Sequence, residues 1–236
     1  MKKIHLILQK CRLFAGIRES DLKNLLDCLS ARQKYFAKNS FVFLAGEKID
    51  SVGIVLSGAV HVMRDDFWGK RKIVARVGPG ALFGEAFSCA AVEKLPVSVM
   101  AAEESEILFV NSKRIISPCT SGEPRPYSTL AAGISTCVFH ATLIKNLTLL
   151  LAERNVALIQ KLEHITQPTT REKLLSYLSE EAQLAGKNAF TIPFNREELA
   201  DYLSVERSAM SAELSKMKDD GLILYQKNRF ELLKGF

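Results

Sequence analysis

The feature that most constrains the fold of this chain is a long segment, residues 137–165, that contains neither proline nor glycine. Within it, four apolar residues recur every seven positions: Ile144, Leu151, Leu158 and Ile165. A seven-residue period on an unbroken helix is typical of a coiled-coil seam, so we predict a dimerisation helix over 137–165. Arg154 and Lys161 interrupt the other seam position, which predicts an imperfect coil. The alternative is a helix that packs on its own domain.

The sequence before this helix alternates apolar and polar residues with a period of two, which is typical of β-strands. The alternating runs include Val52-Ile54-Leu56, Val60-Val62, Ile73-Ala75-Val77 and the apolar stretch Ile107 to Val110. Glycines between these runs suit tight turns. We therefore predict a helical opening and an antiparallel β-roll within residues 1–118, followed by a flexible, proline-rich loop over 119–136.

A second domain is expected over residues 166–236, because Pro168 ends the long helix. Thr169 with Glu172, and Asn195 with Glu198, have the spacing of capping boxes that begin new helices.

Two helices of this second domain are expected over 196–203 and from about 206 to 218, separated by the turn Leu203-Ser204-Val205. This is the spacing of a helix-turn-helix, and Gly221 would end the second helix. Two apolar runs then flank Gln226-Lys227-Asn228, which predicts a hairpin and hence a winged helix. The predicted fold class is α+β, with an antiparallel roll, a long helix and a winged helix.

The second helix of this pair carries candidate DNA-reading residues. Arg207, Ser208 and Ser211 fall on the face opposite Met210 and Leu214, near the helix N-terminus, where a recognition helix meets base edges in the major groove. An arginine can bind a guanine edge with two hydrogen bonds, and serines can reach bases or phosphates.

A solvated helical face is the alternative, because acidic residues lie close by: Glu206, Glu213, Asp219 and Asp220. The net charge of +6 does not decide the question, since residues 166–236 hold ten basic and eleven acidic side chains. A C-terminal domain that docks a protein rather than DNA therefore remains a second hypothesis.

Three stretches of the chain together resemble the CRP/FNR family of bacterial transcription regulators. The first is Gly-Pro-Gly-Ala-Leu-Phe-Gly-Glu at 78–85, with Leu-Pro-Val-Ser-Val-Met-Ala at 95–101 and Glu-Ser-Glu-Ile-Leu-Phe at 104–109. The second is the long helix leading into Thr-Arg-Glu-Lys-Leu-Leu at 170–175. The third comprises 194–203, 207–214 and Asp-Gly-Leu-Ile at 220–223. Each motif is moderately specific, and their common order and spacing make the resemblance strong.

This resemblance implies a roll that senses a signal, a helix that forms a homodimer and a winged helix that binds an inverted-repeat promoter site in double-stranded DNA. RNA polymerase is then an expected partner. Carried over to this sequence, the DNA-binding set comprises Arg207, Ser208, Ser211, Ala212, Arg196 and Lys227. Relatives often place a second basic reader where this chain has Ala212, so the recognised bases should differ, although alanine can contact a thymine methyl.

The same resemblance implies an effector pocket lined by seven residues: Phe83, Gly84, Glu85, Leu95, Pro96, Val156 and Ala157. Relatives that respond to cyclic AMP place an Arg-Ser pair at the position of Leu95-Pro96 to bind the cyclic phosphate. An unpaired phosphate anion in an apolar pocket is unfavourable, so we expect no cyclic AMP here. Gly84 and Glu85 are interpreted as a turn glycine and a roll-capping acid, with a ribose contact as the alternative. The roll would bind another small effector, or none.

A redox or metal signal finds little support in the sequence. Only Cys11 and Cys28 precede the roll, so an iron–sulfur cluster is not expected. Cys119, Cys137 and His140 could approach one another, which leaves a sensing role for them open. Haem is similarly open, because the chain has four candidate histidine ligands but no diagnostic motif: His5, His61, His140 and His164. The chain also has no Gly-x-Ser-x-Gly, His-Glu-x-x-His or Walker-type motif, so we do not expect an enzyme.

The expected location is the cytoplasm. The start of the chain lacks the pattern of a signal peptide, and no apolar run approaches the length of a membrane span. The five cysteines, with no Cys-x-x-Cys pair, are interpreted as reduced thiols.

Overall fold

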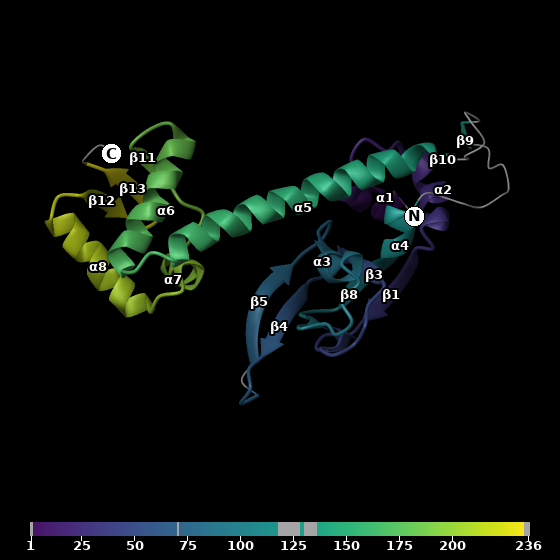
Figure 1. Ribbon diagram of the computed structural model, residues 1–236, viewed down its shortest axis with the longest axis horizontal. Coiled ribbons are helices and arrows are strands. Elements are labelled where there is room, and N and C mark those ends of the chain that lie inside the picture. Colours follow the sequence, from purple (N-terminus) through teal and green to yellow (C-terminus); the bar gives the residue numbers. More distant parts are fainter. Residues whose placement is uncertain (1, 70, 118–127, 130–135, 234–236) are drawn as a thin grey trace. The chain divides into compact units, whose positions relative to one another are not determined.

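The computed structural model describes residues 2–69, 71–117, 128–129 and 136–233 (Figure 1). The chain forms two compact units, Met1–Ala152 and Glu153–Phe236. Their boundary lies within helix α5 (Val138–Ile165), whereas the sequence placed it at the end of this helix. The expected α+β class, with a β-roll, a long helix and a C-terminal helix-turn-helix, is confirmed.

The first unit contains two four-stranded antiparallel sheets, with strand orders β1-β8-β3-β6 and β2-β7-β4-β5. Their strands are β1 (Arg32–Phe36), β2 (Phe41–Phe43), β3 (Ser51–Ser57), β4 (Val60–Asp65), β5 (Arg71–Val77), β6 (Leu82–Phe83), β7 (Ser98–Ala101) and β8 (Ser105–Asn111). The helices of this unit before α5 are α1 (Lys2–Lys10), the 3-10 turn η1 (Arg12–Phe14), α2 (Glu19–Cys28), α3 (Glu85–Cys89) and α4 (Ser112–Ile116). The sheets form the predicted roll.

Two glycines of β3 and its following turn permit close approaches inside the roll. A Cβ atom on Gly53 would lie 2.2 Å from the Phe83 ring. A Cβ atom on Gly58, whose φ is +76°, would lie 2.3 Å from the Glu104 carbonyl oxygen. Any larger residue at either position would therefore push apart strands that are in contact.

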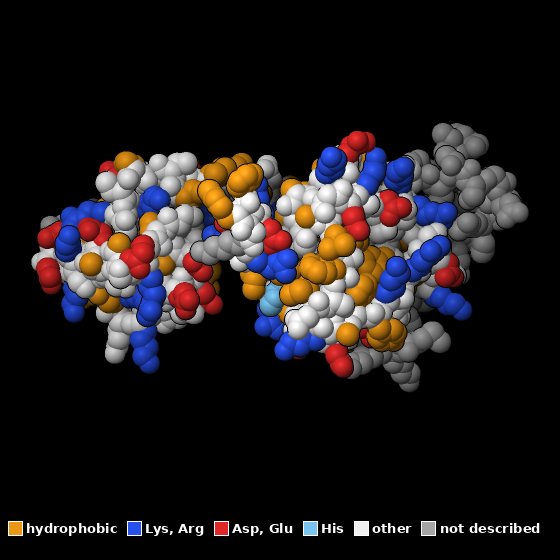
Figure 2. Space-filling view, turned by 90° about the horizontal axis from the view of Figure 1, so that it is seen from below, with side chains coloured by type: hydrophobic (Ala, Val, Ile, Leu, Met, Phe, Trp, Pro, Cys, Tyr) orange, Lys and Arg blue, Asp and Glu red, His pale blue; other side chains and the backbone are white. Residues whose placement is uncertain are grey.

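Strand β5 was predicted correctly as a strand, but its alternation does not mark a buried face. Ile73 and Val74 are both exposed on β5, which is an edge strand of its sheet. Figure 2 shows hydrophobic side chains on the surface of this unit beside lysine and arginine side chains.

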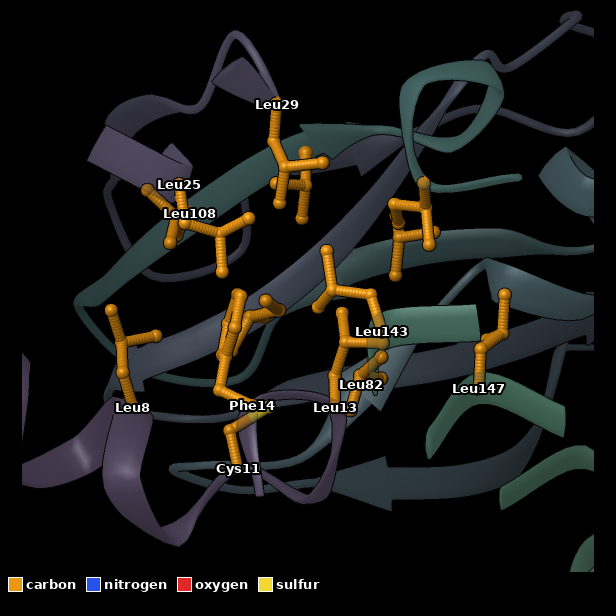
Figure 3. Close-up of a cluster of buried hydrophobic side chains, with 14 of the residues drawn as sticks. Leu8, Cys11, Leu13, Phe14, Leu25, Leu29, Leu82, Leu108, Leu143 and Leu147 are labelled. Atoms are coloured by element: carbon orange, nitrogen blue, oxygen red, sulfur yellow. The ribbon is translucent and has the colours of Figure 1, made fainter. Parts of the chain in front are cut away.

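The first half of α5 packs on the roll's own core. Leu143 and Leu147 of α5 lie in the same buried cluster as Leu13 and Phe14 (Figure 3). Asn146 strengthens this contact, because its Nδ2 donates to the carbonyl oxygen of Leu13 at 2.9 Å. Packing on its own domain, which was the alternative from sequence, is therefore what the structure shows for this half of the helix. No helix in the described part of the chain, α5 included, is long and apolar enough to cross a membrane.

The loop expected over 119–136 lies largely outside the described residues. The structure describes β9 (Ser128–Thr129) and β10 (Thr136–Cys137), which pair as an antiparallel ladder. For the rest of this segment the loop stays a prediction.

The second unit contains the end of α5, three further helices and a three-stranded sheet of order β11-β13-β12. Its elements are α6 (Thr170–Ala185), β11 (Ala189–Thr191), α7 (Arg196–Leu203), α8 (Arg207–Asp219), β12 (Ile223–Gln226) and β13 (Arg229–Leu232). Both predicted capping boxes are present, at the starts of α6 and α7. The sequence missed β11, which is too short to show an alternating pattern.

Candidate nucleic-acid interface and effector site

The candidate recognition helix is α8, which follows α7 after a sharp turn. Ser204 begins this turn in the left-handed region, with φ +53°. The amide of Val205 donates to the Ala200 carbonyl oxygen at 3.0 Å and so closes the end of α7. The two helices pack on each other through Leu199, Leu203, Met210 and Leu214, which share one buried cluster. The predicted helix-turn-helix is confirmed.

The predicted reading face of α8 is exposed to solvent. Arg207, Ser208, Ser211 and Ala212 are all exposed, as is Ser215 one turn further on. The opposite face is fully buried, since Met210, Leu214 and Met217 have no exposed surface. The structure thus brings four of the six predicted DNA-binding residues onto one solvent-facing surface.

The N-terminus of α8 already holds an anion, the Glu206 carboxylate. Its oxygens accept hydrogen bonds from the amides of Ser208 at 3.0 Å and Ala209 at 2.8 Å, and from the Ser208 hydroxyl. These bonds lower the pKa of Glu206 to about 2. Sequence reasoning missed this role of Glu206, because serine, threonine, aspartate and asparagine are the usual caps.

Both serines of the reading face have engaged hydroxyls in the free protein. The Ser208 hydroxyl donates to Glu206, and the Ser211 hydroxyl donates to the Arg207 carbonyl oxygen at 2.9 Å. By contrast, no carboxylate among the described residues lies within ion-pair distance of the Arg207 guanidinium. Arg207 is therefore the reader whose donors are available.

The acidic residues that made the solvated-face alternative plausible are partly neutralised by one arginine. Arg171 of α6 donates from Nε to Glu213 at 2.6 Å and from Nη2 to Asp220 at 2.6 Å. The two bonds raise the pKa of Arg171. Two of the four acidic side chains near α8 are thus paired with Arg171. The sequence could not reveal this pairing, because Arg171 lies 42 residues from Glu213 and 49 residues from Asp220.

Arg196 and Lys227 line one groove of about 490 Å³ together with Asn195. The Arg196 guanidinium lies 4.8 Å from the centre of the Tyr225 ring and 5.0 Å from that of Phe230. Burial there lowers the pKa of Arg196. Arg196 therefore supports the sheet of the wing, whereas Lys227 is exposed at the tip of the hairpin.

On the roll, Phe83, Gly84 and Glu85 form the turn from β6 into α3. Gly84 caps the helix in the left-handed conformation, with φ +77°, and a Cβ atom there would lie 3.3 Å from both Phe43 and Ile49. The Glu85 side chain is almost completely buried. A left-handed glycine before a buried acid matches the interpretation as a turn glycine and a roll-capping residue.

Leu95 fills the apolar interior instead of presenting a polar group. Its side chain is buried in a cluster with Ile49 and Val97. Its backbone is held on both sides, since its amide donates to the Glu47 carbonyl oxygen and its carbonyl oxygen accepts from Gly46, each at 2.8 Å. Pro96 points to solvent.

Val156 and Ala157 of α5 are exposed and belong to the second unit, whereas the other predicted pocket residues belong to the first. Their place in an effector pocket stays a prediction.

Cys11 and Cys28 are buried, and Cys89 is half-buried. Burial raises the pKa of Cys11 to about 11, so this thiol stays protonated at neutral pH. His140 Nε2 lies 2.7 Å from the Arg114 carbonyl oxygen. Cys119 and the side chain of Cys137 lie outside the described residues, and within the described part no group of three or more His, Cys, Asp or Glu could hold a metal ion.

Two known families match separate parts of the chain. The family described as cyclic nucleotide-binding domain matches residues 33–121, and the family described as Crp-like helix-turn-helix domain matches residues 172–234. No curated protein matches the sequence.

Several solved structures resemble the whole chain. The c-di-GMP-responsive global regulator CLP of Xanthomonas campestris is 14% identical, with a TM-score of 0.51, and the match covers 92% of this chain and 100% of that one. The catabolite activator protein of Thermus thermophilus is 20% identical, with a TM-score of 0.48, and the match covers 94% and 93%. DNR of Pseudomonas aeruginosa is 21% identical, with a TM-score of 0.46, and the match covers 97% and 93%. At these identities the likeness concerns the fold.

Proposed function

The chain belongs to the CRP/FNR family of transcription regulators, and on that premise we propose that it is a homodimeric, cytoplasmic DNA-binding regulator that responds to a signal other than cyclic AMP. It binds an inverted-repeat promoter site and acts there with RNA polymerase. Regulation by binding, without catalysis, is what the family supports.

The observation that carries the DNA-binding proposal is the solvent-facing surface of α8. Arg207 stands at the N-terminal end of this helix, with donors that no described carboxylate occupies, and it is the proposed specificity residue. Two such helices in a symmetric dimer would enter successive major grooves about 34 Å apart. The half-sites would therefore lie one helical turn apart.

The dimer is supported by exposed apolar side chains in the second half of α5. Leu158, Ile159 and Leu162 each leave more than half of their surface exposed, at 60%, 52% and 55%. Apolar side chains so closely grouped on one helix are typical of an interface. The repeat that contains Leu158 is thus proposed as the seam, with Leu151 at its start.

The proposal that cyclic AMP does not bind rests on Leu95. This side chain lies in an apolar cluster, so a phosphate placed there would lose its hydration without gaining a partner. Calorimetry should therefore detect no binding of cyclic AMP to the unmodified protein. A micromolar or tighter affinity would contradict the proposal.

Binding-site selection followed by titration at several salt concentrations tests the DNA proposal. Arg207→Ala should weaken binding to the selected DNA site by about 1 to 3 kcal/mol. It should also relax the base preference at one position of each half-site. Lys227 is proposed to contact phosphate from the wing. Lys227→Ala should therefore weaken binding to all DNA sequences alike, and it should reduce the slope of log affinity against log salt concentration by about one unit.

If selection returns no symmetric motif, or if Arg207→Ala binds the selected site as tightly as the wild type, the DNA-reading assignment fails. The second hypothesis, a C-terminal domain that docks a protein, would then be preferred. The negative charge of the exposed Glu206 carboxylate at the start of α8 is the feature that favours it.

A further inference from the structure

The roll has an open groove that the predicted effector residues do not include. It lies between β1 and β2, the edge strands of the two sheets, and its volume is about 760 Å³. This is within the range of roughly 300 to 1,000 Å³ that is common for small-molecule sites. Three phenylalanines and three basic residues line it: Phe36, Phe43, Phe109, Arg32, Lys34 and Lys48.

The phenylalanines form a connected aromatic floor. The rings of Phe36 and Phe109 meet edge to face with centroids 6.1 Å apart, and those of Phe43 and Phe109 meet in the same way at 5.7 Å. All three rings are half-buried, so each keeps part of its surface open. Such a floor suits a flat aromatic group, which can stack on or meet these ring edges.

Arg32 and Lys34 of β1 are exposed to solvent, but they project from the side of their sheet that faces the interior of the roll. In the antiparallel pairing of β1 with β8, Arg32 is opposite Phe109 and Lys34 is opposite Ile107. Residues opposite each other point to the same side of a sheet, and Ile107 is completely buried inside the roll. The Lys34 ammonium accordingly lies 5.7 Å from the centre of the Phe109 ring.

The acidic residues at the rim of the groove do not neutralise Arg32 and Lys34. Glu47 accepts a hydrogen bond from the Leu44 amide at 3.1 Å, and Asp50 accepts one from the Ser51 hydroxyl at 2.7 Å. Lys48 is paired with Glu93 outside the groove lining. Within the described part of the chain, Arg32 and Lys34 have no carboxylate within ion-pair distance, so two positive charges remain beside an aromatic floor.

We propose that this groove binds a small aromatic anion. The ring of the ligand packs on Phe36, Phe43 and Phe109, and its carboxylate binds Arg32 and Lys34. The floor also reaches the turn before α3, because Phe43 is one of the two side chains that a Cβ atom on Gly84 would approach to 3.3 Å. The proposal deepens the proposed function by giving the roll a ligand class, and its test contains no DNA, so either can fail without the other.

Titration of the full chain with 2-naphthoate, followed by fluorescence and calorimetry, tests the charge contribution. We expect saturable binding of one ligand per chain, about tenfold tighter than binding of the neutral 2-naphthamide, because a carboxylate gains charge-assisted hydrogen bonds. Arg32→Gln combined with Lys34→Gln should remove this tenfold preference. The matched control is Lys38→Gln, an exposed lysine just beyond β1, which should leave both affinities unchanged.

Phe109→Leu tests the aromatic floor. It keeps an apolar side chain but removes the ring, so it should weaken the binding of naphthoate and of naphthamide by a similar factor. Circular dichroism and thermal unfolding would confirm that each variant is folded.

Three results would overturn the proposal. They are no saturable binding of naphthoate by the wild type, equal binding of naphthoate and naphthamide, and undiminished naphthoate binding by the Arg32→Gln, Lys34→Gln variant. Any of them would mean that the inward-facing cations only protect an edge strand from pairing with other chains.

Discussion

The two halves of α5 use the same apolar periodicity for different purposes. In the first half, Leu143, Leu147 and Leu150 are buried in the core of the roll. In the second half, Leu158 and Leu162 are exposed. A seven-residue repeat that looks continuous in the sequence is thus divided between a core contact and an uncovered surface. Periodicity locates the apolar side chains of a helix, but it does not say what covers them.

The second half of α5 has a different anchor, a buried histidine. His164 is 2% exposed, and its Nδ1 lies 2.9 Å from the Ser176 hydroxyl of α6. Its Nε2 lies 2.7 Å from Oε2 of Glu180, and the other carboxylate oxygen of Glu180 accepts a hydrogen bond from Gln160. The end of α5 is therefore part of the second unit, which agrees with a unit boundary inside the helix.

The largest expected effect comes from breaking the contact between α5 and the roll. Leu143→Ala removes a completely buried side chain and should lower the free energy of unfolding of the roll by about 2 to 5 kcal/mol. Chemical denaturation followed by roll-specific signals measures this, and sedimentation measures the oligomeric state. The adjacent Ile144→Ala is the matched control, because Ile144 is already 38% exposed. If Leu143→Ala abolished the dimer but left the stability of the roll unchanged, the roles assigned to the two halves of α5 would be reversed.

The complementary change introduces charge into the exposed half. Leu158→Glu with Leu162→Glu should raise the dimer dissociation constant by about 100-fold, which corresponds to about 2.7 kcal/mol, because carboxylates would be buried in the seam. Sedimentation over a range of concentrations provides the measurement. Leu184→Glu, at an exposed leucine of α6, should leave the dimer intact. A double variant that remains dimeric would place the seam elsewhere.

His164→Ala tests whether the end of α5 belongs to the second unit. Glu180 would lose its histidine partner in a partly buried site, so we expect the free energy of unfolding to fall by about 1 to 3 kcal/mol. The loss should appear in hydrogen-exchange protection of α6 and the second half of α5, and the roll should be unaffected. Glu163→Ala, at the exposed neighbouring position, is the control. Equal loss of protection in the roll would contradict a boundary inside α5.

Local patterns in the sequence predicted the parts of this fold that depend on local chemistry. The period of two gave the strands of the roll, and the capping residues Thr169 and Asn195 located the starts of α6 and α7. The pattern could not separate Leu143 from Leu158, because the difference lies in which partner covers them. The alternation along β5 likewise could not reveal an edge strand, since that depends on neighbours distant in sequence.

The candidate site was predictable to a similar extent. The exposed face of α8 followed from helical spacing, which grouped Arg207, Ser208 and Ser211, and the family resemblance added Ala212. The packing of Arg196 on Tyr225 could not be read from sequence, because the ring comes from a distant strand. The same is true of the groove on the roll, whose aromatic rings and the cations Arg32 and Lys34 come from strands β1, β2 and β8.

The smallest expected effect is on DNA affinity, and it concerns the second unit alone. Measuring it tests whether the reading helix α8 acts independently of α5. Glu206→Ser keeps a capping hydroxyl at the start of α8 but removes a negative charge from the surface proposed to meet phosphates. DNA affinity should rise severalfold for all sequences alike, and the gain should shrink as salt is added. Asp219→Asn, at the other end of the same helix, is the control and should have little effect.

The same variant has a characteristic pH dependence. The folded-state pKa of Glu206 is lowered to about 2 from an ordinary value of 4.5, so its stabilising contribution is present above pH 4.5 and is lost as the pH falls towards 2. Glu206→Ser should lack this contribution, so the stability difference between the wild type and the variant should narrow over that interval. The change should appear in the unfolding of the second unit, because α8 packs in that unit's core cluster. An unchanged DNA affinity together with a pH-independent stability difference would mean that the Glu206 carboxylate neither caps α8 nor opposes its approach to DNA.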